Sequence, residues 1–475
     1  MIKRAQALTQ EQISESRDLP SLSKLVQLYD EIKDTQRLTW TLEQLTRLLP
    51  NSGDLRLKLA MLYADAGDKS RTYDLLLKLI NQGYAYDISK EAAFAKVRDT
   101  RVWDYILENF ARNAKPYGEG KVAFELPKGD TLFESIAWDP KRKQYLVGSA
   151  REGKIHLADS NGKLSDFISA DADNGLMAVF GMAVDSAHDR LYVISNGVPH
   201  FQGFNAGMVG KAGLYEFALG TGKFVKKYSL PQDNATHIFS SVAADGKGGV
   251  YVADGVNQQI FRLDGGALQL MLGNPALSGI RGMTVTPDGK TMYFSDTALG
   301  IFGVDLTKRA PFNLAFNAQK LVLGGIDGLY WYSGALIAVQ GGMEPQRVLR
   351  LKLSDDGRTV VGALPLDAAQ PAFDAFAGGT VVGDDLYFIA NSQKDLYSNL
   401  GVLTDASALE PVRVFRSNLH FAWDQKGVDT TPGAAPSVKA PTPEQMEEMR
   451  KTPPKGVVAP PAASKPAEAA AKKDH

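Results

Sequence analysis

The chain has 475 residues, of which 44% are hydrophobic and 23% are charged, and it contains 45 glycines. This length suits two structured parts, and the glycine content is typical of a fold with many turns. The 53 Lys and Arg residues nearly balance the 54 Asp and Glu residues, so no net field attracts nucleic acid or an anionic membrane. The sequence contains no cysteine, which excludes disulfides and thiolate metal sites.

The sequence gives no sign of a membrane segment. No stretch approaches the ~20 apolar residues that a membrane helix needs. Residues 1–16 also lack the apolar middle of a secretory signal. We therefore expect a soluble protein without a membrane or nucleic-acid partner, in the cytoplasm or, if a leader has been removed, in the periplasm.

Residues 19–115, after a short N-terminal segment at 1–18, carry apolar residues at three- and four-residue spacing, which indicates helices. Leu25 and Tyr29 recur as Leu59 and Tyr63, a separation of 34 residues that is typical of tetratricopeptide-like helical hairpins. A third unit at 89–113 keeps the helical pattern but matches the repeat poorly, as a capping repeat does. The module could shield the rest of the chain or bind a protein partner in a groove, and both interpretations stay open.

From Lys121 onward the pattern changes to pairs of strands joined by tight turns. The pair occurs six times, and turns such as Asp245-Gly246-Lys247 carry the residues that close a hairpin. Repeats of roughly 40 to 60 residues with four strands each are typical of propeller blades. We therefore predict a mainly β protein with a six-bladed β-propeller at 119–418, preceded by the tetratricopeptide-like hairpins. Residues 122–126 are expected to return to the last blade and close the ring.

The last part of the chain, residues 427–475, is rich in Pro, Ala and Lys and has few large apolar side chains. Such a composition cannot bury enough apolar surface to order itself, so we expect a disordered tail, with a docking peptide as the alternative. A short helix is predicted at 443–450, isolated by the prolines on both sides.

The blades of a propeller surround one axis, so the residues that open the six innermost strands should form a ring. Blade by blade, these residues are Glu134, Phe180, Ser240, Arg281, Asp327 and Gly378. The end of the second strand lies beside the start of the first, because the two run antiparallel. We therefore expect the polar residues at those ends to face the same channel mouth: Ser149, Asn196, Asp254, Asp296, Gln340 and Asn391.

Two histidines are also expected at the mouth. His237 comes just before the third inner strand, and His200 lies in the long connection at 196–213. That connection carries aromatic residues between glycines and has the length of a lid.

Two short motifs give the propeller a family resemblance. The first blade reads Glu134-Ser135-Ile136-Ala137-Trp138, and the fifth opens with Asp327-Gly328-Leu329. On these residues, and over roughly residues 124–416, the chain resembles the senescence marker protein, gluconolactonase and regucalcin family. The resemblance implies a divalent cation that polarises a lactone, held by Glu134, Asp327 and an Asn opening each of blades 3 and 4. Here those two positions are Ser240 and Arg281, and a guanidinium has no lone pair to donate to a cation.

Three interpretations of the mouth follow. In the first, Ca²⁺ or another divalent cation binds Glu134 and Asp327 with help from Asp296 or water, and a carboxylate or His237 activates water. In the second, there is no cofactor, and Arg281 binds a carboxylate, a phosphate or a developing oxyanion. In the third, Glu134, Arg281 and Asp327 form a structural ion cluster, and the protein is an interaction scaffold.

We favour a small-molecule-binding, lactonase-like propeller that hydrolyses a lactone or ester at the channel mouth, with the scaffold as the alternative. The expected catalytic residues are Asp327, Arg281 and His237, and Glu134 and Asp327 are the candidate metal ligands. The expected ligand contacts are Ser240, Asp254, Asp296, Gln340, Asn391, Asn196 and His200.

Overall fold

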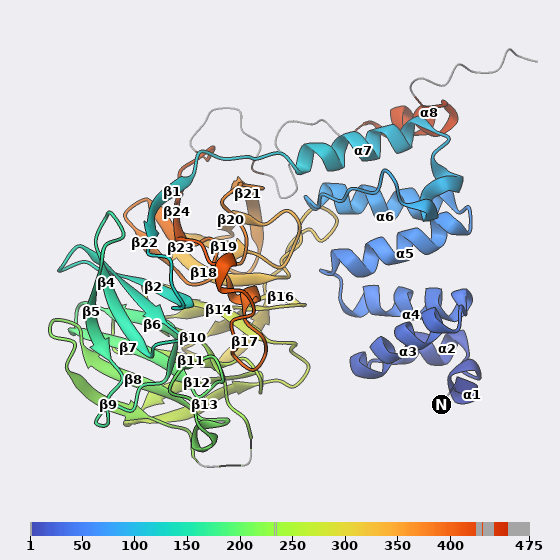
Figure 1. Ribbon diagram of the computed structural model, residues 1–475. Helices are drawn as coiled ribbons and strands as arrows, with labels where there is room; N and C mark the ends of the chain where they lie inside the picture. The colour runs from blue at the N-terminus through green and yellow to red at the C-terminus, as the bar shows by residue number, and fades with distance from the viewer. Residues whose placement is uncertain (1, 232, 234, 424–429, 431–440, 455–475) are drawn as a thin grey trace, which may run out of the picture.

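A computed structural model shows helices at the N-terminal end of the chain and six β-sheets after them (Figure 1). The structure describes residues 2–231, 233, 235–423, 430 and 441–454. None of the helices in these ranges is long and apolar enough to cross a membrane.

The helical module consists of short helices joined by tight turns. They are α1 (Ile2–Gln6), α2 (Gln10–Glu15), α3 (Leu19–Glu31), α4 (Thr35–Leu48), α5 (Gly53–Asp65), α6 (Lys69–Asn81), the 3₁₀ helix η1 (Ala92–Val97) and α7 (Arg101–Asn113). Ser52 begins α5 by accepting a hydrogen bond from the Leu55 amide, and Asp68 begins α6 in the same way. Between these two helices Gly67 has a φ of +80°, a left-handed conformation that favours glycine. The helices and the turn are confirmed, and the tetratricopeptide assignment remains a prediction.

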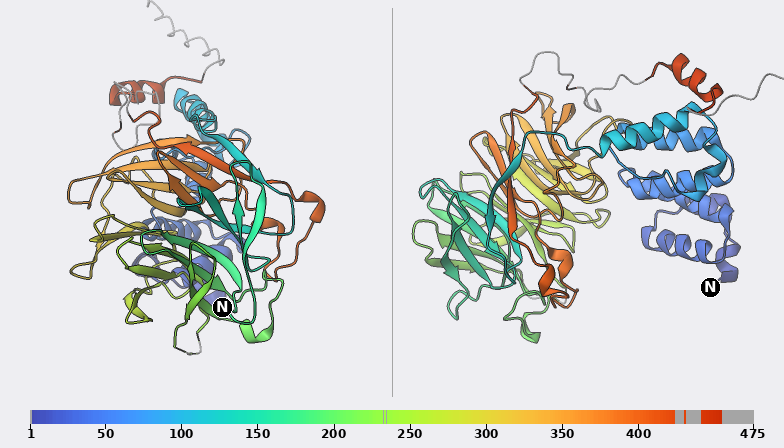
Figure 2. Two further views of the ribbon diagram at one scale, coloured as in Figure 1. Left: turned by 90° about the vertical axis from the view of Figure 1, so that its left-hand side faces the viewer. Right: turned by 45° about the horizontal axis from the view of Figure 1, so that its top comes forward.

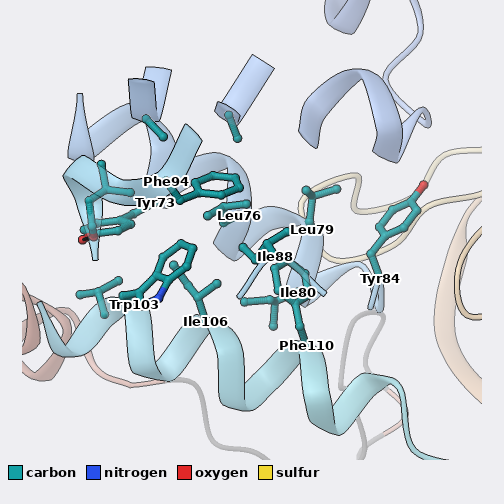
Figure 3. Close-up of a cluster of buried hydrophobic side chains, with 14 of the residues drawn as sticks. Tyr73, Leu76, Leu79, Ile80, Tyr84, Ile88, Phe94, Trp103, Ile106 and Phe110 are labelled. Carbon is teal, nitrogen blue, oxygen red and sulfur yellow. Dashed lines mark hydrogen bonds between the residues drawn. The ribbon is translucent and has the colours of Figure 1, made fainter. Parts of the chain in front are cut away.

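The module buries its own apolar core (Figure 3). Leu76 and Ile80 of α6 share this core with Trp103 and Phe110 of α7 and with Phe94 of η1, and the ring centroids of Phe94 and Trp103 lie 5.3 Å apart. Two propeller residues, Val322 and Met343, are buried in the same cluster. The apolar core of the helices therefore continues into the propeller.

The predicted C-terminal helix forms as α8 (Pro443–Lys451) and lies beside α7 in both views of Figure 2. Met446 and Met449 pack against the helical core, and the Arg101 amide donates a 2.8 Å hydrogen bond to the Thr452 carbonyl. The expectation of an isolated helix in a disordered tail is thus wrong for these residues, because two methionines give the helix an apolar face. Residues 427–429, 431–440 and 455–475 of the predicted tail lie outside the described residues.

In the described part of the chain the strands form six four-stranded antiparallel sheets, which we number as blades. Blade 1 contains β2 (Phe133–Asp139), β3 (Gln144–Ser149), β4 (Lys154–Ala158) and β5 (Leu164–Ser169); blade 2 contains β6 (Ala178–Asp185), β7 (Arg190–Asn196), β8 (Ala212–Ala218) and β9 (Phe224–Tyr228); blade 3 contains β10 (Phe239–Ala244), β11 (Val250–Asp254), β12 (Gln259–Asp264) and β13 (Ala267–Gly273). Blade 4 contains β14 (Ile280–Val285), β15 (Thr291–Asp296), β16 (Gly300–Asp305) and β17 (Ala310–Asn313); blade 5 contains β18 (Ile326–Tyr332), β19 (Ala335–Gln340), β20 (Arg347–Leu353) and β21 (Val360–Ala368). Blade 6 contains β22 (Gly379–Val382), β23 (Asp385–Ile389), β24 (Val412–Asn418) and β1 (Lys121–Leu126).

The ring is closed by the first strand. β1 pairs antiparallel with β24, with Lys121 opposite Arg416 and Leu126 opposite Val412, as predicted. The innermost strands pack in sequence around the axis, and β22 packs against β2 to complete the circle. The six-bladed propeller is therefore confirmed.

The helical module is attached to blades 4 and 5 through buried polar contacts. The Asn51 side chain donates to the Ala298 carbonyl at 3.0 Å and accepts from the Leu323 amide at 3.3 Å. Ala298 follows β15 and Leu323 precedes β18, so both lie at the ends of the blades where the innermost strands begin. The helices therefore contact the propeller at the face where the predicted ring lies.

We expect Asn51→Ala to lower the free energy of unfolding by about 1–3 kcal/mol, because it removes the partner of the buried Leu323 amide and of the partly buried Ala298 carbonyl. Urea denaturation of the full chain measures the change. The control is Asn161→Ala, which truncates an exposed asparagine in a blade 1 turn. Equal stability of the two variants would contradict the proposed attachment.

Candidate functional site

All six residues predicted for the ring line one cavity of about 600 Å³ at the channel mouth. They come from the six blades and are Glu134, Phe180, Ser240, Arg281, Asp327 and Gly378. His200, Tyr330, Phe376, Lys394 and Tyr397 add to the lining. With Asp395, which also lines it, the cavity combines three carboxylates, two cations and several aromatic rings.

A β-bulge at the start of each of the first five inner strands places these residues. The pairing register of the inner strand with its neighbour shifts at Glu134, Phe180, Ser240 and Asp327, and between Ile280 and Met283 in blade 4. A bulge leaves one residue unpaired and changes the direction of its side chain. This local irregularity explains why equivalent residues of different blades meet at the axis.

In blade 6 the equivalent position is a glycine for a steric reason. A Cβ atom on Gly378 would lie 2.8 Å from the Cα atom of Ser135 in blade 1. The Gly378 amide donates a hydrogen bond of 3.0 Å to the Glu134 carbonyl, which joins the last blade to the first. The close approach holds the backbone of Glu134 in place.

Glu134 is the most perturbed acid of the cavity. Its Oε1 atom is buried and has no hydrogen-bond partner in the described part of the chain. Burial raises the pKa of Glu134 to about 7, although the charges of Lys394 and Arg281 oppose the rise. Near neutral pH this side chain is therefore divided between its acid and carboxylate forms.

Asp327, in blade 5, is the second acid. Its Oδ2 atom accepts a hydrogen bond of 3.2 Å from the Gly341 amide. Burial raises the pKa of Asp327, and the nearby charges of Lys394 and Arg281 again act against the rise. Both carboxyl groups thus respond to the same two cations.

Arg281 is exposed and lies in the bulge of β14. We find no ion pair within 4.0 Å between Arg281 and Glu134 or Asp327, which all belong to the described residues. The ion cluster of the third interpretation is therefore not formed by direct contact between these three side chains. The Arg281 guanidinium acts electrostatically on the two acids without contacting them, and it remains available to bind a ligand.

Lys394 is a cavity residue that sequence reasoning missed. It begins the short helix η3 (Lys394–Leu396) in the connection between β23 and β24. Gln393, just before it, is held by hydrogen bonds with the amide and carbonyl of Glu410. The available signal was that connections leaving the second strands can pass over the mouth, whereas the sequence interpretation named only Asn391 in this part of the chain.

The connection at 196–213, predicted to be a lid, is packed against neighbouring loops at the edge of the cavity. Phe201 is buried, and Phe204 and Met208 pack in the same apolar cluster. The Arg151 guanidinium donates to Asp130 and to the carbonyls of His200 and Gly401, so it joins three loops. These bonds hold His200 at the cavity, where burial and the charge of Arg151 lower its pKa.

The polar residues at the ends of the second strands do not line the cavity. They are buried, and their side chains bond mainly to backbone groups of neighbouring segments: Ser149, Asn196, Asp254, Asp296, Gln340 and Asn391. Asp296, for example, accepts hydrogen bonds from the amides of Ser278 and Gly279, just before β14. The expectation of ligand contacts from these residues does not agree with this geometry, because their oxygens and amides are already used to hold the chain.

His237 also lies outside the cavity lining. Its Nδ1 atom is 2.6 Å from an Asp254 oxygen, and its Nε2 atom is 3.1 Å from Asp233. Burial acts to lower the pKa of His237, but the two carboxylates outweigh it and raise the value. The expectation of a catalytic base at this position is not supported by its geometry.

Ser240 lines the cavity, but its hydroxyl donates a 2.7 Å hydrogen bond to the Ile280 carbonyl of blade 4. Among the described residues no group of three or more acidic or histidine side chains could hold a metal ion. A hard cation such as Ca²⁺ needs six to eight oxygen ligands, and here three carboxylates, of which Asp395 is exposed, share the cavity with two positive side chains. The residues present do not fit the divalent cation that the family resemblance implies.

Comparisons with known proteins give likenesses of low identity. No family model and no curated protein matches the chain. A gluconolactonase from Xanthomonas campestris is 16% identical, with a TM-score of 0.43, over 65% of this chain and 92% of its own. A calcium-binding regucalcin from Agrobacterium tumefaciens is 14% identical, with a TM-score of 0.42, over 63% of this chain and 93% of its own. A PQQ-bound aldose sugar dehydrogenase from Streptomyces coelicolor is 12% identical, with a TM-score of 0.41, over 64% and 98%. Likenesses with identities and TM-scores this low do not show what this chain does.

The raised pKa of Glu134 predicts how stability depends on pH. The folded protein holds this proton more tightly than the unfolded chain, so the free energy of unfolding should fall as the pH rises from 4.5 to about 7. Glu134→Gln should remove up to about 3 kcal/mol of that fall. Urea unfolding of both proteins at pH 5 and pH 8 measures this change in the free energy of unfolding.

The matched control for this prediction is Glu125→Gln, on an exposed residue of β1. This variant should keep the decrease in the free energy of unfolding with rising pH that the natural protein shows. An identical pH dependence in the natural protein and in Glu134→Gln would contradict the burial of this acid.

Proposed function

We propose that the cavity binds a small molecule with a carbonyl group and hydrolyses it as a lactone or ester without a metal ion. The observation that carries the proposal is the Glu134 carboxyl group, with a pKa of about 7 and an unpartnered buried oxygen, in one cavity with Arg281 and Lys394. A general base is most effective when its pKa is near the working pH. Fixed cations in a partly enclosed site stabilise negative charge that develops on a substrate oxygen.

In the proposed step the Glu134 carboxylate takes a proton from water while the water oxygen bonds to the carbonyl carbon. The carbonyl oxygen becomes an oxyanion, which Arg281 and Lys394 stabilise. The bond between the carbonyl carbon and the leaving oxygen then breaks, and Glu134 returns its proton to that oxygen. The products are a carboxylic acid and an alcohol, which remain one hydroxy acid when the substrate is a lactone.

The other lining residues suit recognition of the substrate. Asp327 can accept hydrogen bonds from substrate hydroxyls, since among the described residues its Oδ2 atom accepts one hydrogen bond, from the Gly341 amide. The rings of Phe180, Tyr330 and Phe376 offer apolar surface. The gluconolactonase among the structures of similar fold is consistent with this substrate class, but the proposal rests on the cavity.

We expect hydrolysis of some members of a panel of lactones and aryl esters, unaffected by chelator. The kcat/KM value should rise with pH through an apparent pKa near 7, because Glu134 acts in its ionised form. Glu134→Gln should lose 10²-fold or more of kcat and that pH dependence. Arg281→Ala should lose about 10²-fold or more of kcat.

The control is Arg17→Ala, which removes an exposed arginine of the helical module and should keep full activity. Activity that disappears with chelator would contradict the metal-free proposal. If the panel shows neither hydrolysis nor binding, and the natural protein recovers a partner through its helical module, the chain is the interaction scaffold instead.

A further inference from the structure

A second cavity, of about 410 Å³, lies where the helical module meets blade 5, and it has no part in the proposed reaction. Its wall comes from the end of α6, the segment after α7, and the strands β20 and β21. The volume is within the ~300–1,000 Å³ of small-molecule sites. Much of the lining is apolar: Pro116, Tyr117, Leu321, Pro345, Leu349 and Pro365.

The charged groups of this cavity all have the same sign. Arg112, Lys115, Lys320 and Arg347 line it, and no Asp or Glu is among its described lining residues. None of these four cations forms an ion pair within 4.0 Å with a carboxylate in the described part of the chain. Arg112, Lys115 and Lys320 are exposed at the rim, whereas only 6% of Arg347 is exposed.

Arg347 is a buried cation whose hydrogen bonds go to neutral acceptors. Its guanidinium donates to Gln340 Oε1 at 2.7 Å, to the Gln82 carbonyl at 2.9 Å and to the Val322 carbonyl at 3.4 Å. Burial lowers the pKa of Arg347 to about 10, and the electrostatic interaction with Tyr84 offsets only part of that decrease. A buried charge without an opposite charge is costly, so the site favours an anion.

A simpler role for Arg347 accounts for part of this arrangement. The Gln82 carbonyl lies at the C-terminal end of α6, so Arg347 also caps that helix and attaches it to blade 5. The end of a helix, however, carries only about half a negative charge. The cap therefore leaves part of the Arg347 charge uncompensated, and the three rim cations add positive charge without an ion-paired carboxylate in the described part of the chain.

We propose that this cavity binds a small amphiphilic anion, a carboxylate attached to an apolar body. The carboxylate would lie toward Arg347 and the rim cations, and the apolar body would contact Leu321, Leu349 and the prolines. Because the wall belongs to both parts of the chain, the bound ligand would also strengthen the attachment of the helices to the propeller. The site is independent of the reaction at the channel mouth.

Calorimetric titration of the full chain tests the proposal with three probes: octanoate, octanol and inorganic phosphate. Octanoate is expected to bind saturably at one site. Octanol lacks the charge and phosphate lacks the apolar body, so each should bind at least about tenfold more weakly. Octanol binding as tight as octanoate, phosphate binding as tight as octanoate, or no octanoate binding would each overturn the proposal.

Variants locate the binding. Arg112→Glu combined with Lys320→Glu reverses two exposed rim charges and should weaken octanoate binding about tenfold or more. The charge-matched control, Lys163→Glu with Lys247→Glu, changes two exposed blade turns and should leave binding unchanged, with both proteins shown to be folded by their thermal transitions. Arg281→Ala should also bind octanoate normally. Binding that survives the rim reversal, or that is lost with Arg281→Ala, would contradict this location.

Discussion

The candidate functional face of this protein depends on β-bulges that are repeated around a closed ring. Each of the first five inner strands has an irregular register at its start, and the unpaired residue turns toward the axis. Closure of the ring through β1 and β24 keeps these five positions, and Gly378 of the sixth blade, at fixed separations. Without the bulges the ring residues would pair within their own sheets, and without closure they would not share a cavity.

This geometry determines the electrostatics of the cavity. Glu134 and Asp327 are brought from separate blades into a partly enclosed space, where burial raises the pKa of both. The positive charges of Arg281 and Lys394 oppose that rise in pKa, although in the described structure neither side chain forms an ion pair with the two acids. The site is thus prepared for a ligand that carries or develops negative charge, while a hard cation would meet two positive side chains.

The sequence was sufficient to predict the six hairpins, the closing strand and the ring residues, because turns and alternation repeat with the blades and symmetry then places equivalent positions. It misplaced residues such as Asp296 and His237, since a polar side chain at a strand end can face the mouth or bond to backbone, and only packing decides between them. Lys394 was missed because its place depends on a connection held by Gln393 and Glu410 rather than on the repeat. The docking of α8 depends on Met446 and Met449, which pack against a core built mainly by helices near the other end of the chain.

The central claim is that Glu134 exchanges its proton near neutral pH inside the closed ring. The most direct measurement is an NMR titration of the full chain labelled with ¹³C at the glutamate side-chain carboxyl groups, with Glu134→Gln used to assign the signal. The account predicts one glutamate resonance that titrates at about pH 7 and is missing from the variant. If every glutamate resonance titrated near the ordinary value of ~4.3, the proposed cavity chemistry would be contradicted.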